Sequence, residues 1–117
     1  MARKPQPLKG DSLTARIINL ACHHKAKRLG IEEYTIAQLS HDSRLNHSII
    51  LRAVAAHPKE GPTRETVKRL ADALEVALDS ELEDHFWNAF GYASPRQLAA
   101  AQSYVEQVEQ QEKEAET

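Results

Sequence analysis

The sequence predicts an all-α protein, and three observations favour that class. Alanine and leucine dominate the apolar residues, whereas aromatic residues make up only 5% and glycine occurs four times, a composition that favours helix over sheet. Apolar residues recur at three- and four-residue spacings in several segments, which is the period of an amphipathic helix. Helix-capping residues stand at the start of most of these segments, and no strand pattern or internal repeat interrupts them.

The length and composition exclude several classes of protein. At 117 residues the chain has room for one domain and a tail. No apolar run approaches the ~18 residues of a membrane helix, and the basic N-terminus lacks the apolar segment of a secretory signal. A single cysteine, Cys22, excludes an internal disulfide framework and suits a reducing compartment. We therefore expect a cytoplasmic protein without a membrane partner.

The charge is distributed unevenly along the chain, although its net value is only −2. Residues 1–60 hold ten Lys and Arg against five Asp and Glu, together with five of the six histidines. Residues 61–117 hold five against twelve. A basic half joined to an acidic half is expected when one face of a protein meets a polyanion. The plainer alternative is chance combined with a solvated acidic tail.

The chain opens with an arm and a long helix. Residues 1–11 contain two prolines and a glycine without apolar periodicity, which predicts a flexible basic arm. A helix is predicted over residues 12–29, ended by Gly30. Its apolar stripe consists of Leu13, Ile17, Leu20 and Ala21. Cations suit the negative end of the helix dipole in its last turn, which holds Lys25, Lys27 and Arg28.

Two short helices joined by a tight turn are predicted in the segment YTIAQLSHDSRLNHSIILRAV, residues 34–54. Thr35 and Gln38 form a capping box at the start of the first helix. Arg44 stands where the turn needs a positive φ, and Asn46 is a strong N-cap for the second helix. The buried side of that helix is predicted to be Ile50, Ala53 and Val54, with Ile49 at its edge. The remaining face is free to enter a groove and consists of Asn46, His47, Ser48, Leu51, Arg52 and Ala55.

Three further helices are predicted after a loop at residues 56–62. Thr63 caps the first, whose apolar stripe is Val67, Leu70, Ala71 and Leu74. Ser80 with Glu83 forms a capping box for the next, lined by Leu82, Phe86 and Phe90.

The last helix is predicted from Pro95 to about Lys113, with Ser94 as its cap and Gln97 completing a capping box. Its apolar residues follow a 3-4-3 spacing: Leu98, Ala101, Val105 and Val108. This pattern is too short for a firm coiled coil. The stripe can pack on the domain or on its copy in a dimer, and the glutamate-rich end is expected to fray.

Patterns of catalytic and metal sites are missing from the sequence. No histidine pairs with another at i, i+4, and HExxH, paired CxxC, GxSxG, P-loop and GxGxxG motifs do not occur. Cys22 lies beside the first apolar stripe and is better explained as a small core residue than as a nucleophile. We therefore expect a protein that is not an enzyme and needs no metal or cofactor.

Residues 13–78, approximately, resemble the Xre family of Cro and lambda-repressor-like helix-turn-helix domains. The segments that carry the likeness are TIAQLSHDSRLNHSIILR and PTRETVKRLADALEV. The resemblance implies a lambda-repressor-like five-helix domain over 12–92, followed by an additional C-terminal helix and acidic tail over 93–117. LNHSIILRAV also resembles antitoxins of addiction modules. The sequence departs from the family pattern at two places. Arg44 replaces the usual glycine of the turn, and the loop after the second helix of the motif is longer and carries Pro58.

The resemblance implies that the groove is the major groove of double-stranded DNA. Thr35 and Gln38 would hold phosphates. Arg52 would bind a guanine, worth ~1–3 kcal/mol of discrimination, and Leu51 would meet a thymine methyl group. The full set of implied contacts is Thr35, Gln38, Arg44, Asn46, His47, Ser48, Leu51, Arg52, Lys59 and Arg64. In the plainer alternative, Asn46 is only a cap and Arg52 only a surface ion pair.

The function expected from these features is a sequence-specific transcriptional regulator, most simply a repressor, that binds DNA as a homodimer. The expected dimer surface consists of Phe86, Trp87, Phe90, Tyr92, Leu98, Val105 and Val108. The alternative is an antitoxin or other protein-interaction module. Its acidic C-terminal half would then bind a toxin or RNA polymerase, and the protein would autoregulate its operon.

Overall fold

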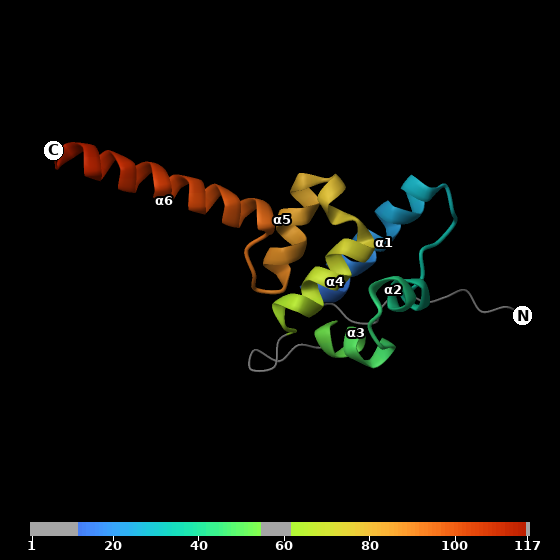
Figure 1. The fold of residues 1–117 in the computed structure, drawn as a ribbon. Helices are drawn as coiled ribbons and strands as arrows, with labels where there is room; N and C mark the ends of the chain where they lie inside the picture. The colour runs from blue at the N-terminus through green and yellow to red at the C-terminus, as the bar shows by residue number, and fades with distance from the viewer. Residues whose placement is uncertain (1–11, 55–61, 117) are drawn as a thin grey trace, which may run out of the picture.

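The computed structural model describes residues 12–54 and 62–116, and these parts of the chain are helical with turns and no strand. The all-α class is therefore confirmed. The elements are α1 (Leu13–Leu29), α2 (Ile36–Ser43), α3 (His47–Val54), α4 (Arg64–Leu74), the 3₁₀ turn η1 (Val76–Leu78), α5 (Ser80–Ala89) and α6 (Pro95–Ala115). Figure 1 shows α1 to α5 gathered into one body, from which α6 projects.

One apolar core joins the first five helices. α1 packs chiefly against α5, and α2 chiefly against α4, while α3 lies across the end of the body. The largest fully buried side chains come from all five helices and include Ile18, Leu39, Ile50, Leu70 and Phe86. The predicted stripe of the first helix is partly wrong, because Leu13 and Leu20 are exposed whereas Ala15 and Ile18 are buried.

Serine or threonine side chains cap the N-terminus of most of the helices, as the sequence predicts. Each accepts a hydrogen bond from the backbone N–H three residues on: Ser12, Thr35, Thr63 and Ser94. Such a cap contributes about 1 kcal/mol. The predicted cap of α5 is wrong by one residue. Asp79, not Ser80, accepts from the N–H groups of Glu81 and Leu82, at 3.1 and 3.2 Å.

Two cations of α1 cap the end of α4 rather than that of α1. The buried ammonium of Lys25 donates to the Ala73 carbonyl, and Arg28 donates to the Leu74 carbonyl at 2.9 Å. Both cations also lie 3.7 Å from the carboxylate of Glu75. The cations of α1 therefore stabilise the negative C-terminal end of α4, and this contact holds α1 against α4.

Candidate nucleic-acid interface

The start of α2 is closed by paired hydrogen bonds between Thr35 and Gln38. The Thr35 hydroxyl accepts from the Gln38 backbone N–H at 3.1 Å. The Gln38 side-chain oxygen accepts from the Thr35 N–H at 2.8 Å. The predicted capping box is confirmed. Gln38 is exposed, and its amide nitrogen takes no part in the box, so it can donate to an anion.

The turn between α2 and α3 is closed by hydrogen bonds to residues at the end of α2. Arg44 adopts the left-handed conformation, with φ 59° and ψ 32°, and its N–H donates to the His41 carbonyl at 3.3 Å. The N–H of Leu45 donates to the Ser40 carbonyl at 3.2 Å, and the Ser40 hydroxyl donates to the Leu45 carbonyl at 2.5 Å. The positive φ predicted for Arg44 is confirmed. The two helices therefore meet at a defined angle.

One side of α3 is anchored in the core. The buried residues are those predicted, namely Ile50, Ala53 and Val54, with Ile49 half-buried at the edge. The last turn of α3 is also held from outside, because the Val54 carbonyl accepts from Ser12 Oγ at 3.3 Å and from Thr14 Oγ1 at 2.9 Å. Both ends of α3 are thus tied to other elements, and its outer side is presented in a fixed orientation.

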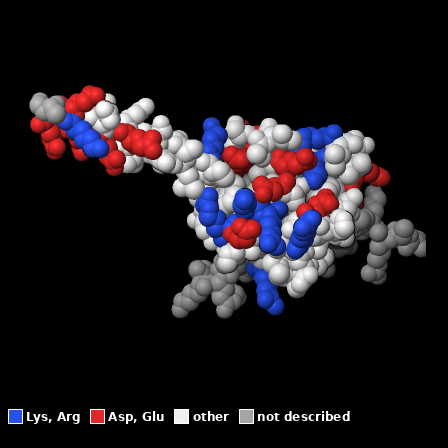
Figure 2. All heavy atoms as spheres, viewed as in Figure 1, with Lys and Arg blue, Asp and Glu red and all other residues white. Residues whose placement is uncertain are grey.

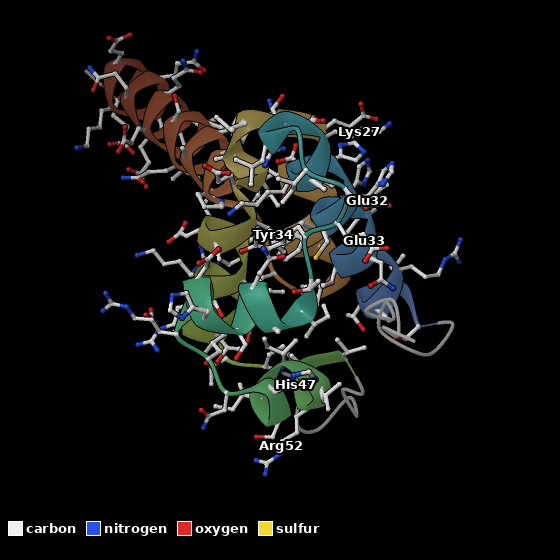
Figure 3. All side chains as sticks on the ribbon, turned by 90° about the vertical axis from the view of Figure 1, so that its right-hand side faces the viewer. Lys27, Glu32, Glu33, Tyr34, His47 and Arg52 are labelled. Carbon is white, nitrogen blue, oxygen red and sulfur yellow. The ribbon has the colours of Figure 1, made fainter. Side chains whose placement is uncertain are left out.

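The outer side of α3 faces solvent. Its exposed residues are Asn46, His47, Ser48, Leu51 and Arg52, which we call the α3 row. Ala55, which was predicted on the same side, lies outside the described residues. Figure 3 shows Arg52 reaching away from the body of the domain. Asn46 occupies the N-cap position through its backbone carbonyl, which accepts two N–H groups of α3 at 2.9 and 3.2 Å. In the parts of the chain that the structure describes, its side chain forms no capping bond, contrary to expectation.

The carboxylate closest to this surface in the sequence, that of Asp42, is engaged by Tyr34 and Lys25. Asp42 accepts a hydrogen bond from the Tyr34 hydroxyl and lies 3.8 Å from the Lys25 ammonium. Lys25 in turn lies 4.5 Å from the centre of the Tyr34 ring. Burial, followed by the bond to Asp42, raises the pKa of Tyr34. Since α3 itself contains no acidic residue, the α3 row presents Arg52 without a carboxylate of its own helix.

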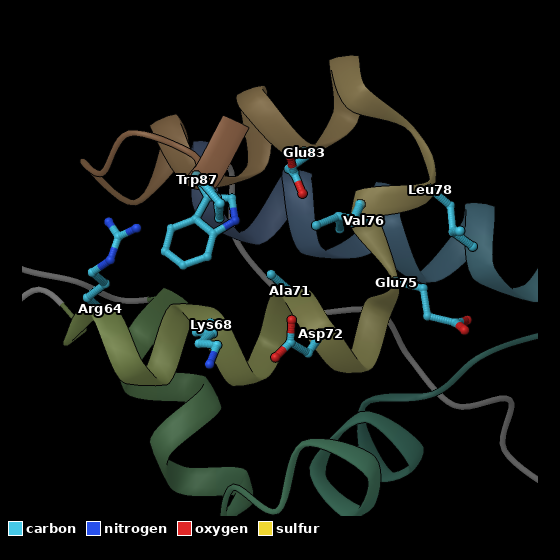
Figure 4. A pocket seen from close by; sticks show the side chains of 11 residues that line it. Arg64, Lys68, Ala71, Asp72, Glu75, Val76, Leu78, Glu83 and Trp87 are labelled. Carbon is cyan, nitrogen blue, oxygen red and sulfur yellow. The ribbon is translucent and has the colours of Figure 1, made fainter. Parts of the chain in front are cut away.

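Lys59 and Arg64 were also expected to contact DNA. Lys59 lies outside the described residues. Arg64 is engaged within the chain: its guanidinium lies 4.8 Å from the Trp87 ring centre and donates to the Ala93 carbonyl at 3.4 Å. Figure 4 shows Arg64 turned toward Trp87, across the groove between α4 and α5. The expected contact of Arg64 with DNA stays a prediction, although the exposed guanidinium also packs on Trp87.

Most of the aromatic residues expected at a dimer surface belong to the core of the single chain. Phe86, Trp87 and Phe90 are buried, and the first and last of them pack with ring centres 5.3 Å apart. Tyr92 is half-buried and donates its hydroxyl hydrogen to the Pro62 carbonyl at 2.6 Å. Phe86, Trp87 and Phe90 are therefore core residues rather than dimer contacts, whereas the expected dimer contact of the half-buried Tyr92 stays a prediction. Leu98, Val105 and Val108, on α6, keep apolar surface open to solvent.

The sequence reasoning missed the cluster that supports α2 from behind. Lys25 was expected to act on the end of its own helix, yet it is buried between Tyr34, Asp42 and Glu75. A lysine followed by two more cations gives no local signal of burial, since its partners lie on other helices.

No family model, curated protein or solved structure matches the chain. Among the helices that the structure describes, none is long and apolar enough to cross a lipid bilayer.

Proposed function

We propose that this chain binds double-stranded DNA sequence-specifically, with α3 in the major groove, and so regulates transcription, most simply as a repressor. The observation that carries the proposal is the α3 row. Its amide, imidazole, hydroxyl and guanidinium groups are the types that read base edges, and the major groove admits one α-helix. Two short helices joined by a tight turn are also the arrangement expected from the likeness to the Xre family.

Leu51 distinguishes this reading from a merely solvated helix face. Its side chain is 47% exposed in the middle of the α3 row, although a large apolar residue gains nothing from water there. In a major groove the same side chain can contact a thymine methyl group. Arg52, next to it, can donate two hydrogen bonds to a guanine, and its own helix holds no carboxylate to compete for it.

Phosphate contacts would flank the row. The amide nitrogen of Gln38, which the capping box at the start of α2 does not use, and the exposed guanidinium of Arg44 in the turn are both donors. Contacts to phosphate set the position of a protein on the duplex without reading sequence. In this proposal, Gln38 and Arg44 fix the register and the α3 row supplies the discrimination.

The test is selection of bound sequences from random DNA, followed by gel shifts with variants. Arg52→Ala should lose ~1–3 kcal/mol of discrimination at one base pair with an unchanged circular dichroism spectrum. Lys113→Ala removes the same charge from the far end of α6 and should bind as wild type. Unchanged specificity in Arg52→Ala would exclude α3 as the reading helix. Failure to enrich any sequence would exclude sequence-specific binding altogether.

We also propose that the protein acts as a homodimer. One such domain makes a small interface, so specific affinity generally needs two half-sites about one DNA turn apart. Since the aromatic residues of α5 are buried, the residues of α6 are those of the expected dimer surface that keep apolar side chains exposed. Light scattering should give twice the mass of the chain at tens of micromolar, and a monomer would overturn this part.

A second candidate function is a protein-interaction module, such as an antitoxin. The observation that favours it is α6, none of whose residues is buried and whose outer half is acidic. If no DNA sequence is enriched and the product of a neighbouring gene co-purifies only with chains that retain α6, the second function replaces the first.

A further inference from the structure

α6 lacks the support that helices normally receive. It spans 21 residues, none of them buried, and Figure 1 shows it leaving the body. Most helical stability in proteins comes from packing an apolar face rather than from propensity. α6 nevertheless exposes apolar residues along one face, which we call the α6 stripe: Leu98, Ala101, Val105 and Val108. Leu98 is 45% and Val105 49% exposed.

The base of α6 is clamped to α5, which fixes the direction in which the helix leaves. Ser94 is fully buried, and its hydroxyl donates to Asp84 at 2.6 Å. Arg96 pairs with the same carboxylate, and Asn88 donates to Gln97 at 2.8 Å. The bond from Arg96, and then that from Ser94, lowers the pKa of Asp84. Folding α6 back onto its own domain would break this clamp, so the α6 stripe needs a partner outside the chain.

The spacing of the α6 stripe points to another helix as that partner. Apolar residues at alternating intervals of three and four form the seam along which two helices pack. A second copy of α6 supplies the same seam. The residues that flank the stripe are mostly uncharged, namely Gln97, Gln102, Tyr104 and Gln111, whereas Glu109 flanks it and Glu112 stands at its next place. Two copies can therefore approach although the helix is acidic overall.

The charges of α6 decide the relative direction of the two helices. Residues 95–104 contain Arg96 and no carboxylate, whereas residues 105–116 contain five glutamates and one lysine. Figure 2 shows acidic side chains gathered over the outer part of α6 and uncharged ones near the body. A parallel pair would place the two acidic halves side by side, where like charges repel. An antiparallel pair places each acidic half beside the uncharged half of the other copy.

The placement of α3 agrees with the antiparallel arrangement. In both ribbon views α3 lies along the lower edge of the body, whereas α6 leaves sideways from the upper part. The two-fold axis of an antiparallel pair is perpendicular to α6, so both α3 helices can face the same side. The axis of a parallel pair runs along α6 and turns them to opposite sides. Two half-sites on one duplex require α3 helices that face the same way.

We infer that the α6 stripe is the docking surface for α6 of a second copy, with the two helices antiparallel. Leu98 of one copy then lies opposite Val108 of the other, and Ala101 opposite Val105. The inference rests on the proposed homodimer and names its surface and orientation. It concerns self-association alone and is tested without DNA.

Single cysteines on α6 distinguish the possible arrangements. In the antiparallel pair, two copies of residue 98 lie about 15 Å apart along the axis, at 1.5 Å per residue. A disulfide requires Cα atoms within ~7 Å. Leu98→Cys and Val108→Cys should therefore each remain uncrosslinked alone and form a disulfide-linked dimer when mixed. The variants are oxidised mildly in the full chain and separated on a non-reducing gel.

Two controls accompany the crosslinking. Ser103→Cys replaces a residue on the opposite side of α6 from the stripe and should not crosslink alone or in either mixture. The wild-type protein should stay uncrosslinked because Cys22 is buried and burial raises the pKa of its thiol to about 12.

Each remaining outcome decides against the inference. Crosslinks in Leu98→Cys and Val108→Cys separately would show a parallel pair and overturn the orientation. The absence of crosslinks in every sample would overturn the α6 stripe as a self-docking surface. Neither result bears on the binding of α3 to DNA, whose gel-shift test stands separately.

Discussion

The ammonium group of Lys25, on α1, donates a hydrogen bond to the backbone carbonyl of Ala73 near the end of α4. The same ammonium faces Asp42 of α2 at 3.8 Å and Glu75 at 3.7 Å. A single buried cation therefore joins three helices, one of which carries the turn that positions α3. The orientation of the proposed reading helix depends on this junction as well as on apolar packing.

Replacing Lys25 by methionine should destabilise the domain. The variant keeps an apolar stem but leaves the Ala73 carbonyl without its donor, and an unsatisfied buried acceptor costs about 1–3 kcal/mol of unfolding free energy. Urea denaturation followed by circular dichroism measures the change. Lys27→Met, at an exposed position of the same helix, should stay within about 0.5 kcal/mol of wild type. Equal effects in both variants would deny the junction a stabilising role.

Glycine at position 44 should stabilise the turn. Arg44 holds φ at 59°, and the left-handed conformation costs a non-glycine residue about 1–2 kcal/mol. Glycine loses more backbone entropy on folding, which offsets part of this gain. We therefore expect Arg44→Gly to raise the free energy of unfolding, measured by urea denaturation, by about 0.5–1 kcal/mol. Glu75→Gly, at φ 56°, should gain less, because Glu75 also pairs with Lys25 and Arg28. A loss of stability in Arg44→Gly would show that the arginine side chain supports the fold.

The clamp at the base of α6 should weaken in acid. Arg96 and Ser94 favour the ionised form of Asp84, so its pKa is lower in the folded state than in the unfolded state. The contribution of ionised Asp84 to the stability of the folded protein is therefore complete above the ordinary aspartate pKa of about 4. It is lost as the pH falls through the lowered pKa of Asp84 in the folded state.

The melting temperature of Asp84→Asn should accordingly lie below that of wild type near neutral pH, and the gap should narrow below about pH 4. Thermal unfolding over a pH series measures this. Glu109→Gln, on the exposed part of α6, should show no such gap. A gap that is constant with pH would mean that the charge of Asp84 does not stabilise the clamp.

Cys22 should be inert in the folded protein. Its side chain is buried, and burial raises the thiol pKa to about 12, so the reactive thiolate is scarce at pH 8. A chromogenic thiol reagent should react with wild type only after urea is added, whereas Ser103→Cys should react at once with one equivalent. Immediate labelling of wild type would show that α1 opens readily.

Local patterns predicted the elements that local interactions determine. The capping boxes at Thr35 and Ser94 and the left-handed Arg44 were predicted because each depends on residues within one turn of chain. The cap of α5 was misplaced because Asp79 and Ser80 are both good capping residues. The 3₁₀ turn before them, which decides between the two, depends on packing against α4 and α5.

Long-range contacts set the limits of sequence reasoning. The burial of Lys25 depends on carbonyls and carboxylates brought from α2 and the end of α4, which no local pattern reports. The aromatic residues of α5 posed a different difficulty. A core and a dimer interface both bury large apolar side chains, so Phe86 and Trp87 could be assigned to either from composition alone. The exposed α3 row was predictable because its buried and free sides alternate at the helical period.

The packing of Trp87 has a practical consequence for optical spectroscopy. It is the one tryptophan of the chain, is 2% exposed, and stands with Arg64 over its ring and Tyr92 at its edge. Its fluorescence thus comes from a single buried environment where α4, α5 and the base of α6 meet. Emission should lie at short wavelength in the native protein and move to longer wavelength when that corner opens. The chain therefore carries its own fluorescent label, placed away from the α3 row.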